Sequence, residues 1–160
     1  MAVVLLGLGS NQNAVHSIQA ALVALTKTFG QLTLSPIYES EAVGFDGDNF
    51  LNMVVEINTK LAVGELWQVL RDIEDAHGRD RTQPKFAGRT LDIDILTYDQ
   101  KVGTIDSVVL PRDEILKNAF VLKPLADTWP QYVHPEVNQT YQALWAAYDQ
   151  SSQKLWPVEL

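Results

Sequence analysis

Two helical hydrophobic patterns, each placed between strand-like runs, constrain the fold of this chain more than any other feature of its sequence. Apolar residues recur every three or four positions in residues 15–29 and again in 62–76, which predicts two amphipathic helices. Continuous or alternating apolar runs, which predict strands, occupy residues 3–9, 32–40, 50–59 and 91–96. The resulting order, β-α-β-β-α-β, predicts an α+β protein with a ferredoxin-like core and a mainly antiparallel sheet.

This core implies a particular arrangement of strands, to which the C-terminal part of the chain adds further elements. We expect the first and last core strands to be adjacent at the centre of the sheet and to run parallel to each other. Helices should cover one face of the sheet, and the other face should remain available for a site. Residues 101–109 predict a hairpin, and residues 115–126 and 141–148 predict two more helices. A chain of 160 residues is expected to form one domain, spanning 1–160.

Composition argues against several classes of protein. The formal net charge of −8 makes the chain a poor candidate for binding a nucleic-acid backbone. No apolar run approaches the length of a membrane span, and the apolar segment 1–6 lacks the basic region of a signal peptide. The chain has no cysteine, which excludes disulfides and thiolate zinc sites. We therefore expect a cytoplasmic protein with no nucleic-acid partner and no membrane partner.

The strand predicted at 91–96 has an apolar face and a face with two carboxylates. Because side chains alternate along a strand, Asp92 and Asp94 project the same way. Neighbouring carboxylates require an exposed face, a bound cation or arginine partners. Four of the 12 Lys and Arg residues lie just before this strand, at Arg79, Arg81, Lys85 and Arg89. The combination predicts a site for magnesium and a polyphosphate; a solvated loop is the alternative interpretation of the basic segment by itself.

Candidate ligand residues also occur on two other predicted elements. Phe50 and Asn52 share the less aliphatic face of their strand, where a ring and an amide can stack on and hydrogen-bond a flat heterocycle. A half-exposed sheet face is the alternative interpretation. Glu74 lies near the C-terminal end of its helix, where a carboxylate opposes the helix dipole. It is therefore either a surface residue or a residue that serves a ligand site.

Other catalytic chemistries have little support in the sequence. The three histidines, His16, His77 and His134, show no metal-ligand spacing and no arrangement for activating a serine. Cysteine catalysis is excluded by composition. What remains is carboxylate-bound magnesium with arginines, which suits phosphoryl-type transfer because that reaction depends on positioning and charge neutralisation.

The segment 88–96, Gly-Arg-Thr-Leu-Asp-Ile-Asp-Ile-Leu, resembles the signature of the 6-hydroxymethyl-7,8-dihydropterin pyrophosphokinase family. Phe-Leu-Asn at 50–52 and Ile-Glu-x-x-x-Gly-Arg at 73–79 resemble the same family. Further similar segments extend the match over nearly the whole chain in the right order, at 5–11, 38–45 and 119–125. The long run at 88–96 is specific, whereas a bare Asp-x-Asp is not.

The resemblance implies transfer of pyrophosphate from ATP to the hydroxymethyl group of a reduced pterin, which leaves AMP. ATP would be the co-substrate and the reduced pterin the acceptor, and a monomer is expected. Asp92 and Asp94 would hold two Mg²⁺ ions, and Arg79 and Arg89 would be the catalytic residues. The resemblance further implies a pterin site at Ser40, Val43, Phe50, Asn52 and Phe120. It implies nucleotide contacts at Glu74, Arg81, Phe86, Ile95, Arg112 and Lys117.

The chain departs from the family pattern at two nucleotide-contact positions. Arg112 stands where the family usually has histidine, and Asn118 stands where it usually has arginine. These departures leave open a divergent relative that binds pterin or nucleotide with little or no turnover. A nucleotide-sugar transferase that uses Asp-x-Asp is a weaker alternative, because the chain is short for it and the arginine loop would have no role.

Overall fold

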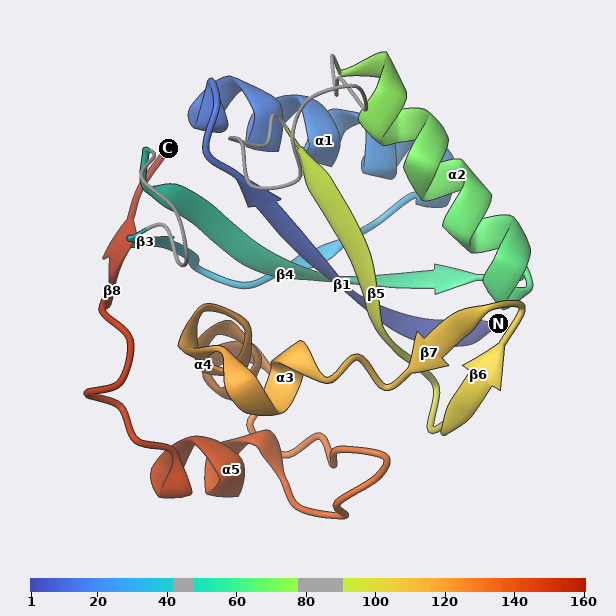
Figure 1. Cartoon of the computed structure of the whole chain (residues 1–160). Coiled ribbons are helices and arrows are strands. Elements are labelled where there is room, and N and C mark those ends of the chain that lie inside the picture. Colours follow the sequence, from blue (N-terminus) through green and yellow to red (C-terminus); the bar gives the residue numbers. More distant parts are fainter. Residues whose placement is uncertain (42–47, 78–90) are drawn as a thin grey trace.

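The computed structural model describes residues 1–41, 48–77 and 91–160, and within them the chain is built around a central antiparallel sheet (Figure 1). The strand order is β5-β1-β4-β3-β8, and β2 pairs with β4 beside β3. The strands are β1 (Ala2–Ser10), β2 (Thr33–Leu34), β3 (Ile37–Ser40), β4 (Phe50–Thr59), β5 (Asp92–Tyr98) and β8 (Leu155–Val158). The predicted α+β, ferredoxin-like class is confirmed.

The orientation of the first and last core strands corrects one prediction. β1 and β5 are adjacent, as expected, but they run antiparallel rather than parallel. The reason lies in the two helical crossovers. Each helix returns the chain so that the strands it joins point the same way, with one strand inserted between them. β5 therefore runs parallel to β4, and β1, which lies between these two strands, is antiparallel to both.

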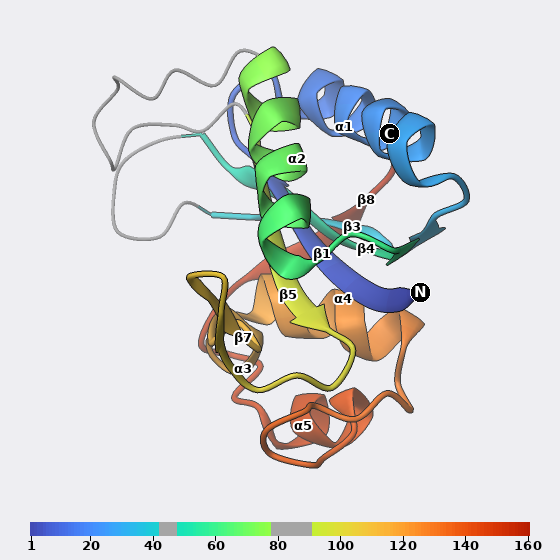
Figure 2. The same cartoon turned by 90° about the vertical axis from the view of Figure 1, so that its right-hand side faces the viewer.

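Helices α1 (Ala14–Phe29) and α2 (Val63–Ala76) cover one face of the sheet (Figure 2). α1 ends at Gly30, whose φ of 82° lies in the left-handed region that glycine adopts without strain. Near the start of α2, a Glu65 Oε1 accepts the backbone N–H of Ala62 at 2.9 Å, which satisfies one of the free donors of the first turn. The main core lies between these helices and the sheet and includes Leu6, Ile57 and Leu66, all fully buried.

The other face of the sheet, on which the site residues are expected, is covered by helices over part of its area. α4 (Ala119–Thr128) packs there against Leu5, Val54 and Leu96, and α5 (Tyr141–Ala147) lies outside α4 (Figure 2). The predicted hairpin is present as β6 (Gly103–Ile105) and β7 (Val108–Leu110). The helix predicted at 115–126 is divided into α3 (Glu114–Lys117) and α4, because Asn118 between them is extended, with φ −117° and ψ 123°.

Strand β8 is an element that the sequence pattern does not reveal. It has only four residues, one of them Pro157, and pairs with β3 at the edge of the sheet. Proline lacks the N–H that a strand with neighbours on both sides requires, so it is found on edge strands. The run predicted as one strand at 32–40 forms the separate strands β2 and β3 on the two sides of Pro36, since proline cannot donate a hydrogen bond to a sheet.

Candidate active site

Three neighbouring strands place an amide and a carboxylate in one row across the sheet. In the register of the sheet, Gly9 of β1 is paired with Asn52 of β4 on one side and with Asp92 of β5 on the other. Residues directly opposite in register project from the same face. A Cβ added at Gly9 would lie 2.8 Å from Asn52 Oδ1. Glycine therefore leaves room for the amide and keeps a space between Asn52 and Asp92.

Asn52, which lies in this row, is one of the residues predicted to bind the pterin ring. Asn52 is buried, and its Nδ2 donates a hydrogen bond to Ser40 Oγ at 3.3 Å. Ser40 of β3 is paired with Phe50 of β4, so three predicted residues are grouped at one end of the two strands. Phe120 lies in the first turn of α4, the helix that covers the same sheet face further along. The structure thus brings together the amide of Asn52, the hydroxyl of Ser40 and the aromatic ring of Phe50.

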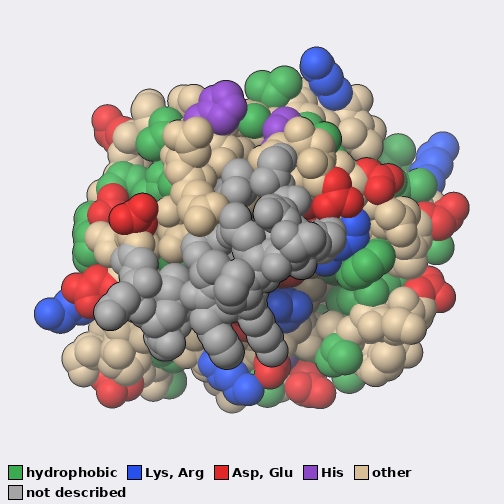
Figure 3. Space-filling model, turned by 45° about the horizontal axis from the view of Figure 1, so that its top comes forward, with side chains coloured by type: hydrophobic (Ala, Val, Ile, Leu, Met, Phe, Trp, Pro, Cys, Tyr) green, Lys and Arg blue, Asp and Glu red, His purple; other side chains and the backbone are tan. Residues whose placement is uncertain are grey.

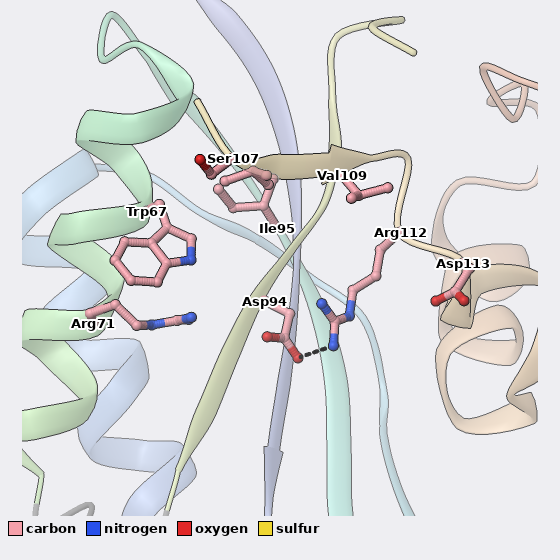
Figure 4. A pocket seen from close by; sticks show the side chains of 9 residues that line it. Trp67, Arg71, Asp94, Ile95, Ser107, Val109, Arg112 and Asp113 are labelled. Carbon is pink, nitrogen blue, oxygen red and sulfur yellow. Dashed lines mark ion pairs between the residues drawn. The ribbon is translucent and has the colours of Figure 1, made fainter. Parts of the chain in front are cut away.

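Asp94 of β5 lies on the same face as Asp92, one row further along the strand, opposite Gly7. Burial raises the pKa of the Asp94 carboxyl, an effect that Arg112 opposes and the charge of Asp92 reinforces. Arg112 Nη2 lies 3.7 Å from Asp94 Oδ2 (Figure 4). The same atom lies 2.9 Å from Glu114 Oε1. The carboxylate pair therefore has an arginine partner in the described part of the chain, contributed by the segment after β7.

Glu74 is fully buried, so the interpretation of it as a surface residue is wrong. Its Oε2 accepts the backbone N–H of Ile93 at 2.7 Å, and its Oε1 lies 2.8 Å from Arg71 Nε. Arg71 also donates to the backbone carbonyl of Ile93. The Arg71–Glu74 pair thus joins α2 to the backbone of β5 between Asp92 and Asp94, and positions the strand that carries both carboxylates.

A cavity of about 400 Å³ adjoins Asp94 at the edge of β5, between α2 and β7 (Figure 4). Arg71 lies over the ring of Trp67, with 5.0 Å from its guanidinium carbon to the ring centroid. The cavity combines apolar, aromatic and charged side chains, as small-molecule sites do. It is lined by Trp67, Arg71, Asp94, Ile95, Ser107, Val108, Val109, Arg112 and Asp113.

Sequence reasoning found three of these lining residues, Asp94, Ile95 and Arg112, and missed the others. One available signal is the spacing of Trp67 and Arg71, four positions apart on a helix and therefore on one face. The contribution of β7 has no comparable signal, because it depends on how the hairpin folds back onto α2.

The two departures from the family pattern have different surroundings. Arg112 lines the cavity beside Asp94. Asn118, in contrast, accepts a hydrogen bond from Gln153 Nε2 at 3.1 Å, and Gln153 Oε1 accepts the N–H of Ala119 at 2.8 Å. Lys117 is exposed and pairs with Asp113 at 2.9 Å, next to the cavity lining. Positive charge at this end of the cavity therefore comes from Arg112 and, at its margin, Lys117.

Several predicted site residues lie outside the described residues, namely Val43, Arg79, Arg81, Phe86 and Arg89. On the face shown in Figure 3, some acidic and basic side chains of the described residues lie close to one another. Within the same residues, no group of three or more His, Cys, Asp or Glu could hold a metal ion by itself, and no helix is long and apolar enough to cross a membrane. A cation at Asp92 and Asp94 would therefore need further oxygen ligands from a substrate or water.

The carboxylate pair beside a cavity with arginines suits a transferase that acts on a phosphate-bearing small molecule. The family model described as 7,8-dihydro-6-hydroxymethylpterin-pyrophosphokinase (HPPK) matches residues 5–130. The chain belongs to this family. It is an enzyme, a diphosphotransferase, which transfers pyrophosphate from ATP, its co-substrate, to hydroxymethyldihydropterin in folate biosynthesis. No finding favours the alternative of a relative without turnover.

Relatives agree with this assignment, and a solved structure shares the fold. The 2-amino-4-hydroxy-6-hydroxymethyldihydropteridine pyrophosphokinase of Aquifex aeolicus is 35% identical, with 84% of this chain and 85% of that protein covered. The protein of the same name from Porphyromonas gingivalis is 39% identical, with 85% and 96% covered. The wild-type HPPK-DHPS of Plasmodium falciparum, solved with pterin and p-hydroxybenzoate, has a TM-score of 0.73 at 17% identity. The match covers 92% of this chain but only 43% of that longer one.

Proposed function

We propose that pyrophosphate transfer takes place on the sheet face where Asn52 and Asp92 flank Gly9. The observation that carries this proposal is the strand register, in which Gly9 is paired with both residues. An acceptor held at Asn52 would thus be directly beside the carboxylates that handle the donor. Such placement turns the encounter of two substrates into a reaction within one complex, a major source of rate enhancement for transfer reactions.

The pterin ring would be held by Asn52, with its ring plane against Phe50 and Phe120. The Asn52 amide offers both a donor and acceptor lone pairs, which match the mixed polar edge of a pterin. Its hydrogen bond to Ser40 Oγ keeps the amide in one orientation. We assign Ser40 and Val43 to the lining of the same pocket, so the resemblance and the geometry of the described residues support a single pterin site.

ATP would occupy the cavity at the edge of β5. Ile95 and the residues of β7 provide apolar surface for the nucleotide, and Arg112, with Lys117 at the margin, provides positive charge for its phosphates. The contacts of Glu74 favour a role in positioning Arg71 and β5 over direct contact with the nucleotide. Arg81 and Phe86 remain proposed nucleotide contacts on the basis of the family resemblance.

Asp92 and Asp94 would hold two Mg²⁺ ions when the triphosphate is bound. Asp92 and Asp94 supply only oxygen ligands from one sheet face, and Mg²⁺ in such sites takes one or two carboxylates and completes its shell with phosphate oxygens and water. When bound, magnesium neutralises charge on the triphosphate during transfer. Asp92 and Asp94 would orient the phosphates, Asn52 would orient the acceptor, and Arg79 and Arg89 would stabilise the charge that develops on the transferred group.

Three further properties belong to this proposal. We propose a cytoplasmic location, a monomer, and one domain over residues 1–160. Chain length and the family match over residues 5–130 support the single domain, and the composition agrees with the proposed location. Reduced pterin and ATP are the small-molecule partners.

Incubation with ATP, Mg²⁺ and 6-hydroxymethyl-7,8-dihydropterin is expected to release AMP in step with formation of the pterin diphosphate. The products can be separated and quantified by anion-exchange chromatography. Omission of the pterin is the control and should leave ATP intact. Binding of both substrates, shown by calorimetry, without formation of AMP would instead support the relative without turnover.

A further inference from the structure

Arg112 is held in place by contacts at both its backbone and its side chain. Its N–H donates to the carbonyl oxygen of Leu96 at 2.9 Å, which fixes the residue against the end of β5. Its guanidinium lies 2.9 Å from Glu114 Oε1 and 3.7 Å from Asp94 Oδ2. The nearby guanidinium of Arg71 is already engaged by Glu74 and the backbone of Ile93. Arg112 is thus the cation that pairs directly with Asp94 in the described part of the chain.

We infer that Arg112 is a built-in counter-cation for Asp94, which weakens metal binding to the carboxylate pair until a polyphosphate draws the guanidinium away. This inference rests on the proposed metal role of Asp92 and Asp94. A guanidinium and a divalent cation compete for the same carboxylate, because each brings positive charge to within contact distance of it. In the protein without nucleotide, Arg112 therefore reduces the attraction that the pair offers to a metal ion.

The position of Arg112 in the cavity indicates which ligand could break its ion pair with Asp94. Arg112 and Asp94 both line the cavity at the edge of β5, and Figure 4 shows the guanidinium directed toward Asp94. A polyphosphate in this cavity offers the planar guanidinium several oxygens and a higher negative charge than one carboxylate. The guanidinium is closer to Glu114, at 2.9 Å, than to Asp94, at 3.7 Å, so its contact with Asp94 can be lost while its shorter contact is kept. Metal and nucleotide should therefore bind with positive coupling, each raising the affinity of the other.

Titration of the nucleotide-free protein with Mn²⁺, with free Mn²⁺ measured by electron paramagnetic resonance, tests this inference. Arg112→Ala is expected to bind Mn²⁺ about fivefold more tightly than the wild type, the change that loss of one close, partly exposed cation can produce. Arg112→Lys keeps the charge and should stay close to the wild type. Lys60→Ala is the matched control, because Lys60 follows Thr59 at the opposite end of β4 from Asn52 and its loss changes the net charge equally.

A second titration, with a non-hydrolysable ATP analogue present, measures the coupling. The analogue should raise Mn²⁺ affinity more in the wild type than in Arg112→Ala, where Asp94 is already released. If Arg112→Ala is poorly folded by circular dichroism, Arg112→Gln replaces it as the neutral variant. Equal Mn²⁺ affinity of the wild type and the neutral variant without nucleotide would overturn the inference.

Asp94→Asn, added to the neutral Arg112 variant, separates failure of this inference from failure of the metal assignment. Loss of Mn²⁺ binding in the double variant, together with tighter binding in the single variant, is the expected result. Loss in the double variant with no gain in the single one would reject the role of Arg112 and keep the metal site. Unchanged binding in the double variant would place the metal elsewhere and reject both.

Discussion

Replacement of Asp92 or Asp94 by alanine is expected to abolish pyrophosphate transfer while the protein remains folded. Each change removes oxygen ligands from the proposed magnesium site, and a metal contributes several kcal/mol of transition-state stabilisation. Since each 1.4 kcal/mol corresponds to a factor of ten, kcat should fall by about 10³-fold or more. Both side chains project from a sheet face without packing into the main core, and removal of one relieves repulsion of the other. AMP formation at saturating substrates gives the rate.

Asp72→Ala is the matched control for these variants. Asp72 is an exposed carboxylate of α2 whose hydrogen bond is with Gln68 on the same helix, so its loss should leave kcat unchanged. Thermal unfolding should show cooperative transitions for all three variants. Substantial activity in either Asp92→Ala or Asp94→Ala would refute the proposed metal ligands.

Glu74→Ala is expected to lower the free energy of unfolding by about 3–5 kcal/mol, the usual cost of removing one partner of a buried ion pair. The change would leave the half-buried Arg71 guanidinium without its carboxylate and the buried N–H of Ile93 without its acceptor. Urea unfolding followed by circular dichroism measures the loss. Turnover should fall as well, because Ile93 lies between the two carboxylates of β5.

Two comparisons make the Glu74 experiment specific. Glu74→Gln keeps an oxygen that can accept the Ile93 N–H, and should therefore lose less stability than the alanine variant. Asp72→Ala, on the same helix but exposed, should change the free energy of unfolding by no more than about 0.5 kcal/mol. A Glu74→Ala protein as stable as Asp72→Ala would show that the Arg71–Glu74 pair does not hold β5 to α2.

The fold was largely predictable because its main elements have clear periodicity. The helices at 15–29 and 62–76 and the strands around them carry enough apolar residues to specify their type and order. The predicted parallel direction of β1 and β5 is wrong. Their relative direction depends on the order of all the strands in the sheet, which the pattern of one segment does not contain. β8 was missed because four residues with a proline carry no strand periodicity, and its pairing with β3 is determined by the packing of the chain that precedes it.

Part of the candidate site could also be predicted from sequence periodicity, and part depends on tertiary packing. The alternation of side chains along a strand placed Asp92 with Asp94 and Phe50 with Asn52, and the register confirmed that Asn52 and Asp92 share a row. The contacts of Arg71, Trp67 and Arg112 could not be foreseen. They join α2, β5 and the segment after β7, elements distant in sequence that meet only through tertiary packing.

A crystal structure with Mg²⁺, an inert ATP analogue and 6-hydroxymethyl-7,8-dihydropterin tests the central claim most directly. The account predicts the pterin ring hydrogen-bonded to Asn52, its hydroxymethyl group directed across Gly9, and metal ions between the triphosphate and the carboxylates of Asp92 and Asp94. The nucleotide should fill the cavity at the edge of β5, with Arg112 turned from Asp94 toward the phosphates. A pterin bound away from Asn52, or metal ions that do not touch Asp92 and Asp94, would contradict it.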